Sequence, residues 1–349
     1  MINLCTLFNS NYLSRGLALY KSLSETCPNF HLYVFAFDDQ CHNFLQQQNY
    51  QHLTAIALKD FEDDELLTVK PSRSPAEYCW TCTPSTILYC IKKFQLPSCT
   101  YIDADIIFYS NPAVLIEEMG NDSVLISEHR YTKLYDQSLD SGIYCVQFMC
   151  FKNTEHGMKV LQWWRNTCLE WCYARIEDGK FGDQKYLDDW PSKFEGVHVL
   201  QHLGGGIAPW NVQQYGFEKN NGKLMLIHKV NKKKYPVVFF HFHGLKFYEK
   251  NIVECTKALY ELDKLVKELF YIPYIRRLTQ VSTELSKHIQ FDPNGATGKA
   301  PSRVFIFITY LKNFIFALKN DPSAIVQLKN YNFKKHFHYW KLNKLIHHH

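Results

Sequence analysis

The first 130 residues alternate between short apolar runs and segments in which apolar residues have helical spacing. Including two later runs, strands are predicted at residues 2–8, 31–37, 99–102, 124–127, 142–151 and 237–242. Helices are predicted at 13–23, at 83–94 with Pro84 in an early position, and at 157–175. Such alternation predicts an α/β sandwich with a mostly parallel central sheet, a fold class that binds ligands at the carboxyl ends of its strands.

The pattern changes after residue 250. Helical spacing continues over 251–270, and a linker rich in Pro and Gly follows at 291–302. Two basic, aromatic segments come next, and both are predicted to be helical. We therefore expect an α/β domain at 1–250 and a C-terminal helical region at 251–346, with 347–349 as the remnant of an expression tag.

Composition excludes a disordered chain, because 46% of the 349 residues are hydrophobic and only 21% are charged. The net charge is +5, but residues 301–346 hold eight Lys/Arg and one acid, which is +7 and leaves −2 for the rest. Basic and aromatic side chains interleave in this segment, which favours an anionic membrane surface as a partner over nucleic acid or a solvated helical cap. The longest apolar run, 304–318, is interrupted by Lys312 and Asn313, so no membrane-spanning helix is predicted.

The twelve cysteines predict a reduced protein. Several lie in apolar runs, and no signal peptide precedes the first strand, so we expect a cytoplasmic chain, or one peripheral on the inner face of the cytoplasmic membrane. Cys79 and Cys82 form a CxxC. No second pair has the spacing of a zinc site, which favours a structural role.

Two aspartates follow a buried apolar run. Asp103 and Asp105 come directly after residues 99–102, and strand alternation would put both carboxylates on one face, about 7 Å apart. Such a pair repels itself unless a cation lies between, and Mg²⁺ and Mn²⁺ prefer oxygen ligands. The pattern indicates a metal site that could bridge a diphosphate; the alternative is a solvated turn.

A pair of histidines ends a late apolar run. On a strand His241 and His243 share one face, and an imidazole suits a third metal ligand. Gly244 permits a close backbone approach to a ligand, and Lys246 offers a phosphate-binding cation. The alternative is two core histidines with satisfied hydrogen bonds.

Asp183 and Gln184 stand next to each other at a predicted helix start. Their carboxylate and amide can bind sugar hydroxyls. The alternative is that Asp183 caps the helix, which is compatible with such a role.

Over about residues 1–250 these motifs resemble the GT-A glycosyltransferases, most of all family 8. Asp103-Ala104-Asp105 matches the DxD that holds Mn²⁺ or Mg²⁺ on a nucleotide diphosphate. Asp183-Gln184 matches the family's D-Q pair near the donor and acceptor sugars, and His241–Gly244 matches its H-F-x-G metal-histidine motif. The resemblance implies that Asp183 and Gln184 are catalytic and that Asp103, Ala104 and Asp105 bind the nucleotide sugar.

The opening segment resembles the family's first strand and nucleotide-binding loop. Thr6, Phe8 and Tyr12 would then bind the nucleotide, with an aromatic ring near the base. The chain departs from the family in three places, one of which is that no Trp follows Lys246. Lys246 lies five residues after His241 where the family's lysine lies six, and Gln147 stands where a small residue is usual.

Four more residues are candidates for binding. Arg73 precedes the helix before the acidic pair, where related transferases contact donor sugar and phosphates. Trp210 and Asn211 follow a Gly-rich loop suited to a sugar, and His129 follows the strand after the acidic pair, on the acceptor side. The alternatives are a core Trp in a turn and a solvated loop.

The function expected from the resemblance is transfer of a hexose from a nucleotide-diphosphate sugar, in the first place a UDP-sugar, to a glycan or glycolipid, as in synthesis of bacterial surface polysaccharides. Retention of anomeric configuration is favoured. The alternatives are a DxD-type phosphohydrolase and a non-catalytic nucleotide-sugar-binding protein of the same fold. The residues identify neither the sugar nor the acceptor.

Overall fold

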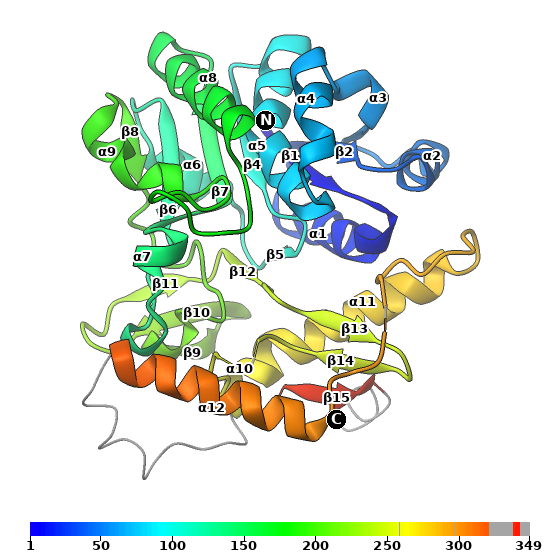
Figure 1. Cartoon of the computed structure of the whole chain (residues 1–349), viewed down its shortest axis with the longest axis vertical. Helices are drawn as coiled ribbons and strands as arrows, with labels where there is room; N and C mark the ends of the chain where they lie inside the picture. The colour runs from blue at the N-terminus through cyan, green and yellow to red at the C-terminus, as the bar shows by residue number, and fades with distance from the viewer. Residues whose placement is uncertain (258, 297, 321–337, 343–349) are drawn as a thin grey trace.

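A computed structural model describes residues 1–257, 259–296, 298–320 and 338–342. Figure 1 shows two stacked parts, with the main sheet and its helices above and smaller sheets with the C-terminal helices below. The acidic pair lies where the two parts meet, between β4 above and β5 below.

The main sheet has seven strands in the order β3-β2-β1-β4-β7-β6-β8. β3, β2, β1 and β4 run parallel, β7 is antiparallel to both of its neighbours, and β8 is parallel to β6. The strands are β1 (Ile2–Phe8), β2 (Phe30–Ala36), β3 (Leu53–Ala57), β4 (Ser98–Ile102), β6 (Val124–Glu128), β7 (Tyr144–Lys152) and β8 (Val197–Val199). The predicted mostly parallel α/β sandwich is therefore confirmed.

Each face of the sheet is covered by its own hydrophobic core. Along β1, Cys5 and Leu7 enter the core under α5 (Pro75–Lys93) and α8 (Glu155–Glu170), while Leu4 and Phe8 enter the core under α1 (Leu13–Thr26). This alternation is what a strand buried on both faces requires. The shorter helices of the upper part are α2 (Asp39–Gln48), α3 (Leu58–Phe61), α4 (Asp64–Val69), α6 (Ala113–Glu118), α7 (Ser138–Ser141) and α9 (Trp190–Lys193).

Helix α5 begins earlier than predicted. The Ser74 hydroxyl accepts a hydrogen bond from the Glu77 amide, and the Glu77 carboxylate accepts one from the Ser74 amide, which is a capping box. The helix therefore starts at Pro75, and Pro84 lies in its interior rather than near its start.

The described residues of the lower part form three small sheets. β5 (Ile106–Phe108) pairs with β12 (Phe239–His241), and β9 (Tyr215–Asn220), β10 (Lys223–His228) and β11 (Lys234–Pro236) form a meander. β13 (Lys246–Tyr248), β14 (Ile252–Glu254) and β15 (Tyr339–Lys341) form the third sheet. The expected boundary at residue 250 lies in the turn between β13 and β14.

The prediction of a helix over 251–270 is wrong for its first half. Lys250 and Asn251 have φ values of 61° and 56°, which turn the chain back so that β14 pairs with β13. Helical structure begins only at α10 (Lys264–Val266) and continues through a π-turn into α11 (Ile272–Leu285).

Of the two basic segments, the first is the helix α12 (Arg303–Asn320). In the second, the described residues form the edge strand β15 rather than a helix, and the rest of it, like 347–349, lies outside the described residues. Within the described chain, none of the helices has both the length and the apolar character needed to cross a bilayer. All twelve cysteines are free, and all except the half-buried Cys79 are buried.

Candidate active site

The acidic pair occupies a tight turn rather than a strand, which corrects the sequence-based placement. β4 ends at Ile102 and β5 begins at Ile106, so Asp103 and Asp105 both lie in the link between the two parts. The Asp103 amide donates a hydrogen bond to the Gln147 carbonyl (3.1 Å), and the Phe242 amide donates one to the Asp105 carbonyl (2.9 Å). The backbone of the turn is thus held by β7 on one side and by the end of β12 on the other.

His241, the last residue of β12, completes a compact group with the two aspartates. Its Nε2 lies 3.1 Å from Oδ1 of Asp105 and 3.7 Å from Oδ2 of Asp103. One ligand atom from each of the three residues lies within 4.8 Å of the others. Two carboxylates and one imidazole suit a divalent cation such as Mn²⁺ or Mg²⁺, so the residues fit the metal that the motif implies.

Gln147 holds the His241 ring. The Nδ1–H of His241 donates a hydrogen bond to the Gln147 side-chain Oε1 over 2.9 Å, deep in the interior. A histidine whose Nδ1 is used in this way presents Nε2 to a metal, in an orientation set by the outer partner. Gln147, which departs from the family pattern, therefore positions the candidate ligand.

His243 lies near this group without joining it. Its ring centroid is 5.7 Å from that of His241 and 5.5 Å from that of Trp210. Burial and the nearby Lys257 ammonium lower the pKa of His243 to about 3, so its ring is neutral at physiological pH.

The electrostatics of the group are asymmetric. Burial raises the pKa of Asp103 to about 6, whereas for Asp105 the effect of burial is outweighed by His241 and the pKa is about 2. Burial alone would lower the pKa of His241, but the two carboxylates raise it well above 6.5. Without a metal, therefore, a protonated imidazole supplies the positive charge that the carboxylates require.

A cavity of about 580 Å³ opens over the group. The predicted site residues that line it are Phe8, Tyr12, Asp103, Ala104, Asp105, His129, Asp183, Gln184, Trp210, His241 and His243. They come from β1, the 3-10 turn η1 (Ser10–Tyr12), the turn after β4, the segment after β6, the loop before the 3-10 turn η4 (Lys185–Asp189), the loop before the 3-10 turn η5 (Val212–Gln214), and β12 with the residues after it. The structure thus collects residues more than 200 positions apart around one cavity.

Four predicted site residues do not line the cavity. Thr6 is fully buried inside β1, and Arg73 donates to the Leu169 carbonyl (3.1 Å) with its guanidinium over the Tyr173 ring. The Asn211 amide is fully used by backbone atoms, of Gly206 and Ala208 in its own loop and of His129 after β6. Lys246 is exposed on β13, with its ammonium 5.1 Å from the Tyr248 ring.

Lys257 lines the cavity and was missed by the sequence analysis. It stands beside the residues after β12, since the Thr256 hydroxyl donates a hydrogen bond to the His243 carbonyl (3.0 Å). Burial lowers the pKa of Lys257. No local signal could have found this residue, because its position depends on the reversal at Lys250–Asn251.

Asp183 and Gln184 approach the cavity from the loop before η4. Burial, with the Asp103 carboxylate nearby, raises the pKa of Asp183 to about 8, so the carboxyl group is largely protonated at pH 7 and can donate a hydrogen bond. The Gln184 amide donates to the Ser141 carbonyl (2.7 Å). Asp183 does not cap η4, which follows Gln184 and has no side-chain cap.

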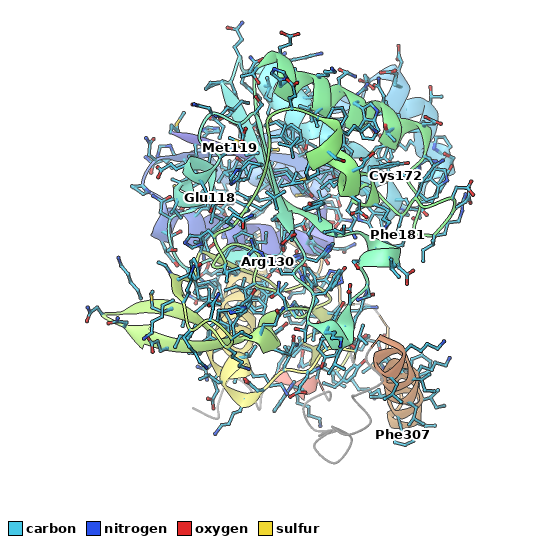
Figure 2. All side chains as sticks on the ribbon, turned by 90° about the vertical axis from the view of Figure 1, so that its left-hand side faces the viewer. Glu118, Met119, Arg130, Cys172, Phe181 and Phe307 are labelled. Carbon is cyan, nitrogen blue, oxygen red and sulfur yellow. The ribbon has the colours of Figure 1, made fainter. Side chains whose placement is uncertain are left out.

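An aromatic group around His129 forms another part of the cavity wall. The His129 ring stacks on Tyr131 at 4.6 Å, and the Trp210 Nε1–H donates to the His129 carbonyl (2.8 Å). The Trp210 ring meets the His241 ring edge-on at 5.4 Å, so it buttresses the candidate metal ligand. The next residue, Arg130, lies at the junction of the two parts (Figure 2), where it donates to the Gly205 carbonyl (3.0 Å) and so ties the segment after β6 to the Gly-rich loop.

No protein-family model matches the chain. Two proteins of Bacillus subtilis (strain 168), both described as uncharacterised, are each 29% identical to it: YfnD over 301 residues (85% of this chain, 94% of the relative) and YfnF over 309 residues (84% and 97%). Among solved structures, the galactosyltransferase LgtC in complex with donor and acceptor sugar analogues is 11% identical and superposes with a TM-score of 0.50, covering 82% of this chain and all of LgtC. The bifunctional glycosyltransferase WbbM gives 0.47 at 11% identity, over 82% of this chain and 50% of WbbM. With the sheet order described above, the likeness to LgtC shows that this chain has the fold of the GT-A glycosyltransferases.

Proposed function

We propose that the protein is a metal-dependent glycosyltransferase that moves a hexose from a nucleotide-diphosphate sugar, in the first place a UDP-sugar, to a glycan or lipid-linked glycan. One observation carries the proposal: Asp103, Asp105 and His241 converge at the carboxyl end of β4, beneath a cavity of about 580 Å³, in a chain with the GT-A fold. Ligands of α/β sheets bind at this end of the strands.

Asp103, Asp105 and His241 would hold Mn²⁺ or Mg²⁺. A bound divalent ion neutralises the charge that develops on a departing diphosphate. His243 is the alternative imidazole ligand, but its separation from the aspartates makes it the weaker candidate.

Cationic and aromatic side chains of the cavity suit the nucleotide. Lys257 lines the cavity and would contact the diphosphate, which is the role expected of Lys246 from its position after the histidines. The Tyr12 ring lines the cavity and is held from behind by the Arg15 guanidinium, 4.2 Å from its centroid. This ring, or that of Phe8, which also lines the cavity, would stack near the base.

Asp183 and Gln184 would contact the sugars. A protonated Asp183 donates a hydrogen bond to a sugar oxygen, and Gln184 is held toward the cavity by Ser141. His129 and Trp210 also line the cavity and would contact the acceptor. The family resemblance favours retention of anomeric configuration, which proton NMR of the first-formed product tests directly.

The test is an assay of the full chain with a panel of UDP-, GDP- and CDP-sugars, with and without Mn²⁺, and with glycan acceptors. We expect metal-dependent release of the nucleoside diphosphate that rises with acceptor. Release of inorganic phosphate from simple phosphate esters would instead indicate a phosphohydrolase. Metal-dependent UDP binding with no turnover on any donor would indicate a binding protein.

The helix α12 supports an anionic membrane surface as partner. Val304, Ile308, Leu311 and Ile315 form one stripe at spacings of four, three and four residues, and each is between 43% and 69% exposed. The charged residues of α12 are all basic. An amphipathic helix with these features lies in a lipid interface without spanning it.

The position of α12 links this surface to the cavity. α12 packs against the 3-10 turn η3 (Lys133–Tyr135), and the residues flanking this turn, Tyr131 and Gln137, line the cavity. A protein docked through α12 would therefore hold the acceptor side of the cavity near the lipid surface, where a lipid-linked glycan is found.

A further inference from the structure

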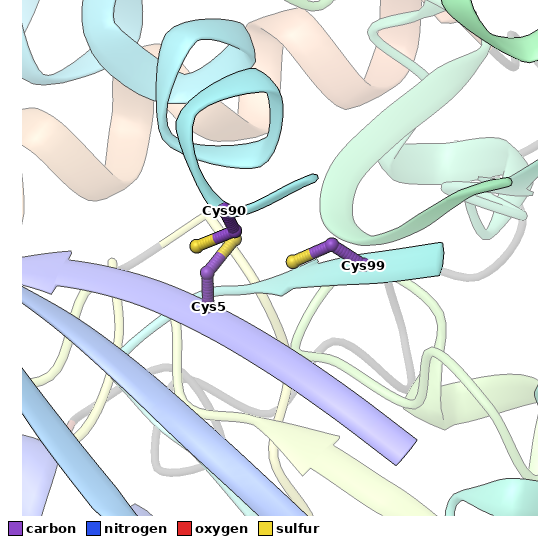
Figure 3. A group of neighbouring side chains, drawn as sticks. All are labelled: Cys5, Cys90 and Cys99. Carbon is purple, nitrogen blue, oxygen red and sulfur yellow. The ribbon is translucent and has the colours of Figure 1, made fainter. Parts of the chain in front are cut away.

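A second group of metal-ligating side chains lies behind the cavity. Cys5 on β1, Cys90 on α5 and Cys99 on β4 have sulfur atoms within 4.8 Å of one another. Figure 3 shows the sulfurs of Cys5 and Cys90 close together and the Cys99 side chain pointing toward them. All three thiols are free and fully buried.

The spacing of the sulfurs suits a soft metal ion. With a Zn–S distance of about 2.3 Å, an ion at the centre of three thiolates would separate them by about 4.0 Å. The three sulfurs now lie within 4.8 Å of one another, so only small side-chain movements would bring them to this separation. Among the described residues, this is the only group made of cysteines alone.

Thr86 offers a fourth ligand. It lies one turn before Cys90 on α5, and its hydroxyl donates a hydrogen bond to the Thr83 carbonyl (2.7 Å). Because its proton is engaged there, the oxygen faces the Cys5 sulfur, 3.7 Å away, as a lone-pair donor. With the Thr86 oxygen the three sulfurs would give the coordination number of four that structural zinc sites have.

We propose that Cys5, Cys90 and Cys99, with Thr86, form a structural site for a thiophilic d10 cation, with Zn²⁺ as the physiological ion. Binding releases three thiol protons to solvent and forms three metal–thiolate bonds, leaving one net negative charge. The ion would join β1, β4 and α5 directly behind the cavity, because β1 ends at Phe8, β4 ends before Asp103 and α5 carries Thr83 of the lining. Since the site is closed, the ion enters as the chain folds.

The test uses the full chain expressed in zinc-supplemented medium and dialysed against EDTA under reducing conditions, which empties the accessible carboxylate site. We expect elemental analysis to find one zinc per chain. Cys90→Ser and Cys99→Ser should lose most of it, whereas Cys150→Ser, a fully buried cysteine of β7 outside the group, should keep it.

A second measurement covers the case in which these variants fail to fold. The unmutated chain is refolded with Cd²⁺, and cadmium NMR should report a resonance in the range of three-thiolate coordination, with a thiolate-to-cadmium absorption band. Absence of retained zinc together with absence of the band overturns the proposal. So does a band of equal strength in a folded Cys90→Ser chain.

Discussion

Asp105 is the carboxylate nearest the candidate histidine ligand, with its Oδ1 3.1 Å from Nε2 of His241. Replacing Asp105 by Asn keeps the shape of the turn and removes the negative charge that a divalent ion needs. We expect metal-dependent turnover to fall by more than about 100-fold, while the circular dichroism spectrum stays unchanged. Turnover close to that of the unmutated protein at saturating Mn²⁺ would rule out this metal site.

The two histidines make different predictions. His241→Ala should weaken Mn²⁺ activation by at least about tenfold more than His243→Ala, because only His241 reaches both carboxylates. The measurement is the Mn²⁺ concentration for half-maximal activity in each variant. A larger effect of His243→Ala would identify His243 as the ligand, and equal effects would contradict the assignment to His241 alone.

Gln147 provides a test that leaves every candidate ligand in place. Its Nε2 has no hydrogen-bond partner among the described residues, while its Oε1 accepts from His241. Gln147→Leu keeps the volume and removes the constraint on the ring, so apparent Mn²⁺ affinity should fall by about 10–100-fold with turnover at saturating metal largely retained. An unaltered Mn²⁺ dependence would mean that the ring is held by packing alone.

At the scale of the element, α12 can be tested without deleting it. Deletion of 301–349 would also remove β15, whose Tyr339 donates a hydrogen bond to Glu254 (2.7 Å). Ile308→Glu with Leu311→Glu should instead lower binding to anionic vesicles by more than about tenfold, since each apolar side chain contributes up to about 1.5–3 kcal/mol when buried in lipid. Co-sedimentation at low and high salt is the measurement.

The matched control is Val230→Glu, which changes an 85% exposed valine in the turn between β10 and β11. It should bind vesicles as the unmutated chain does. If the unmutated chain fails to sediment with anionic vesicles, the membrane proposal is wrong. Binding to nucleic acid would then identify that partner, and binding to neither would identify α12 as a helical cap.

At the scale of the whole molecule, the cavity joins both parts, so a ligand that fills it should stabilise the fold. A ligand that binds only the folded state at about 100 times its Kd adds about 2.7 kcal/mol. We expect UDP with Mn²⁺ to raise Tm by a few degrees, and either one alone to raise it much less, because Asp103 and Asp105 repel a diphosphate unless a metal lies between. Equal shifts with and without Mn²⁺ would contradict the proposed function.

The sequence alone determined the sandwich and the approximate limits of β1, β2, β4, β6 and β7. These strands are buried on both faces, so their continuous apolar runs can be recognised in the sequence without knowledge of the neighbouring strands. The acidic pair and the histidine pair could be recognised as candidate ligands because each stands at the end of such a run. The capping box of α5 was also a local signal, although the predicted helix start did not use it.

The tertiary structure decided which of these residues share a cavity. His241 rather than His243 faces the aspartates because β12 pairs with β5 in one register, and Lys257 rather than Lys246 enters the cavity because the chain reverses at Lys250–Asn251. β14 pairs locally with β13, whereas the three-residue strand β15 depends on pairing with β14 across more than 80 residues. Local patterns report the burial of a segment, whereas register, reversal and long-range pairing depend on contacts between segments that the sequence keeps apart.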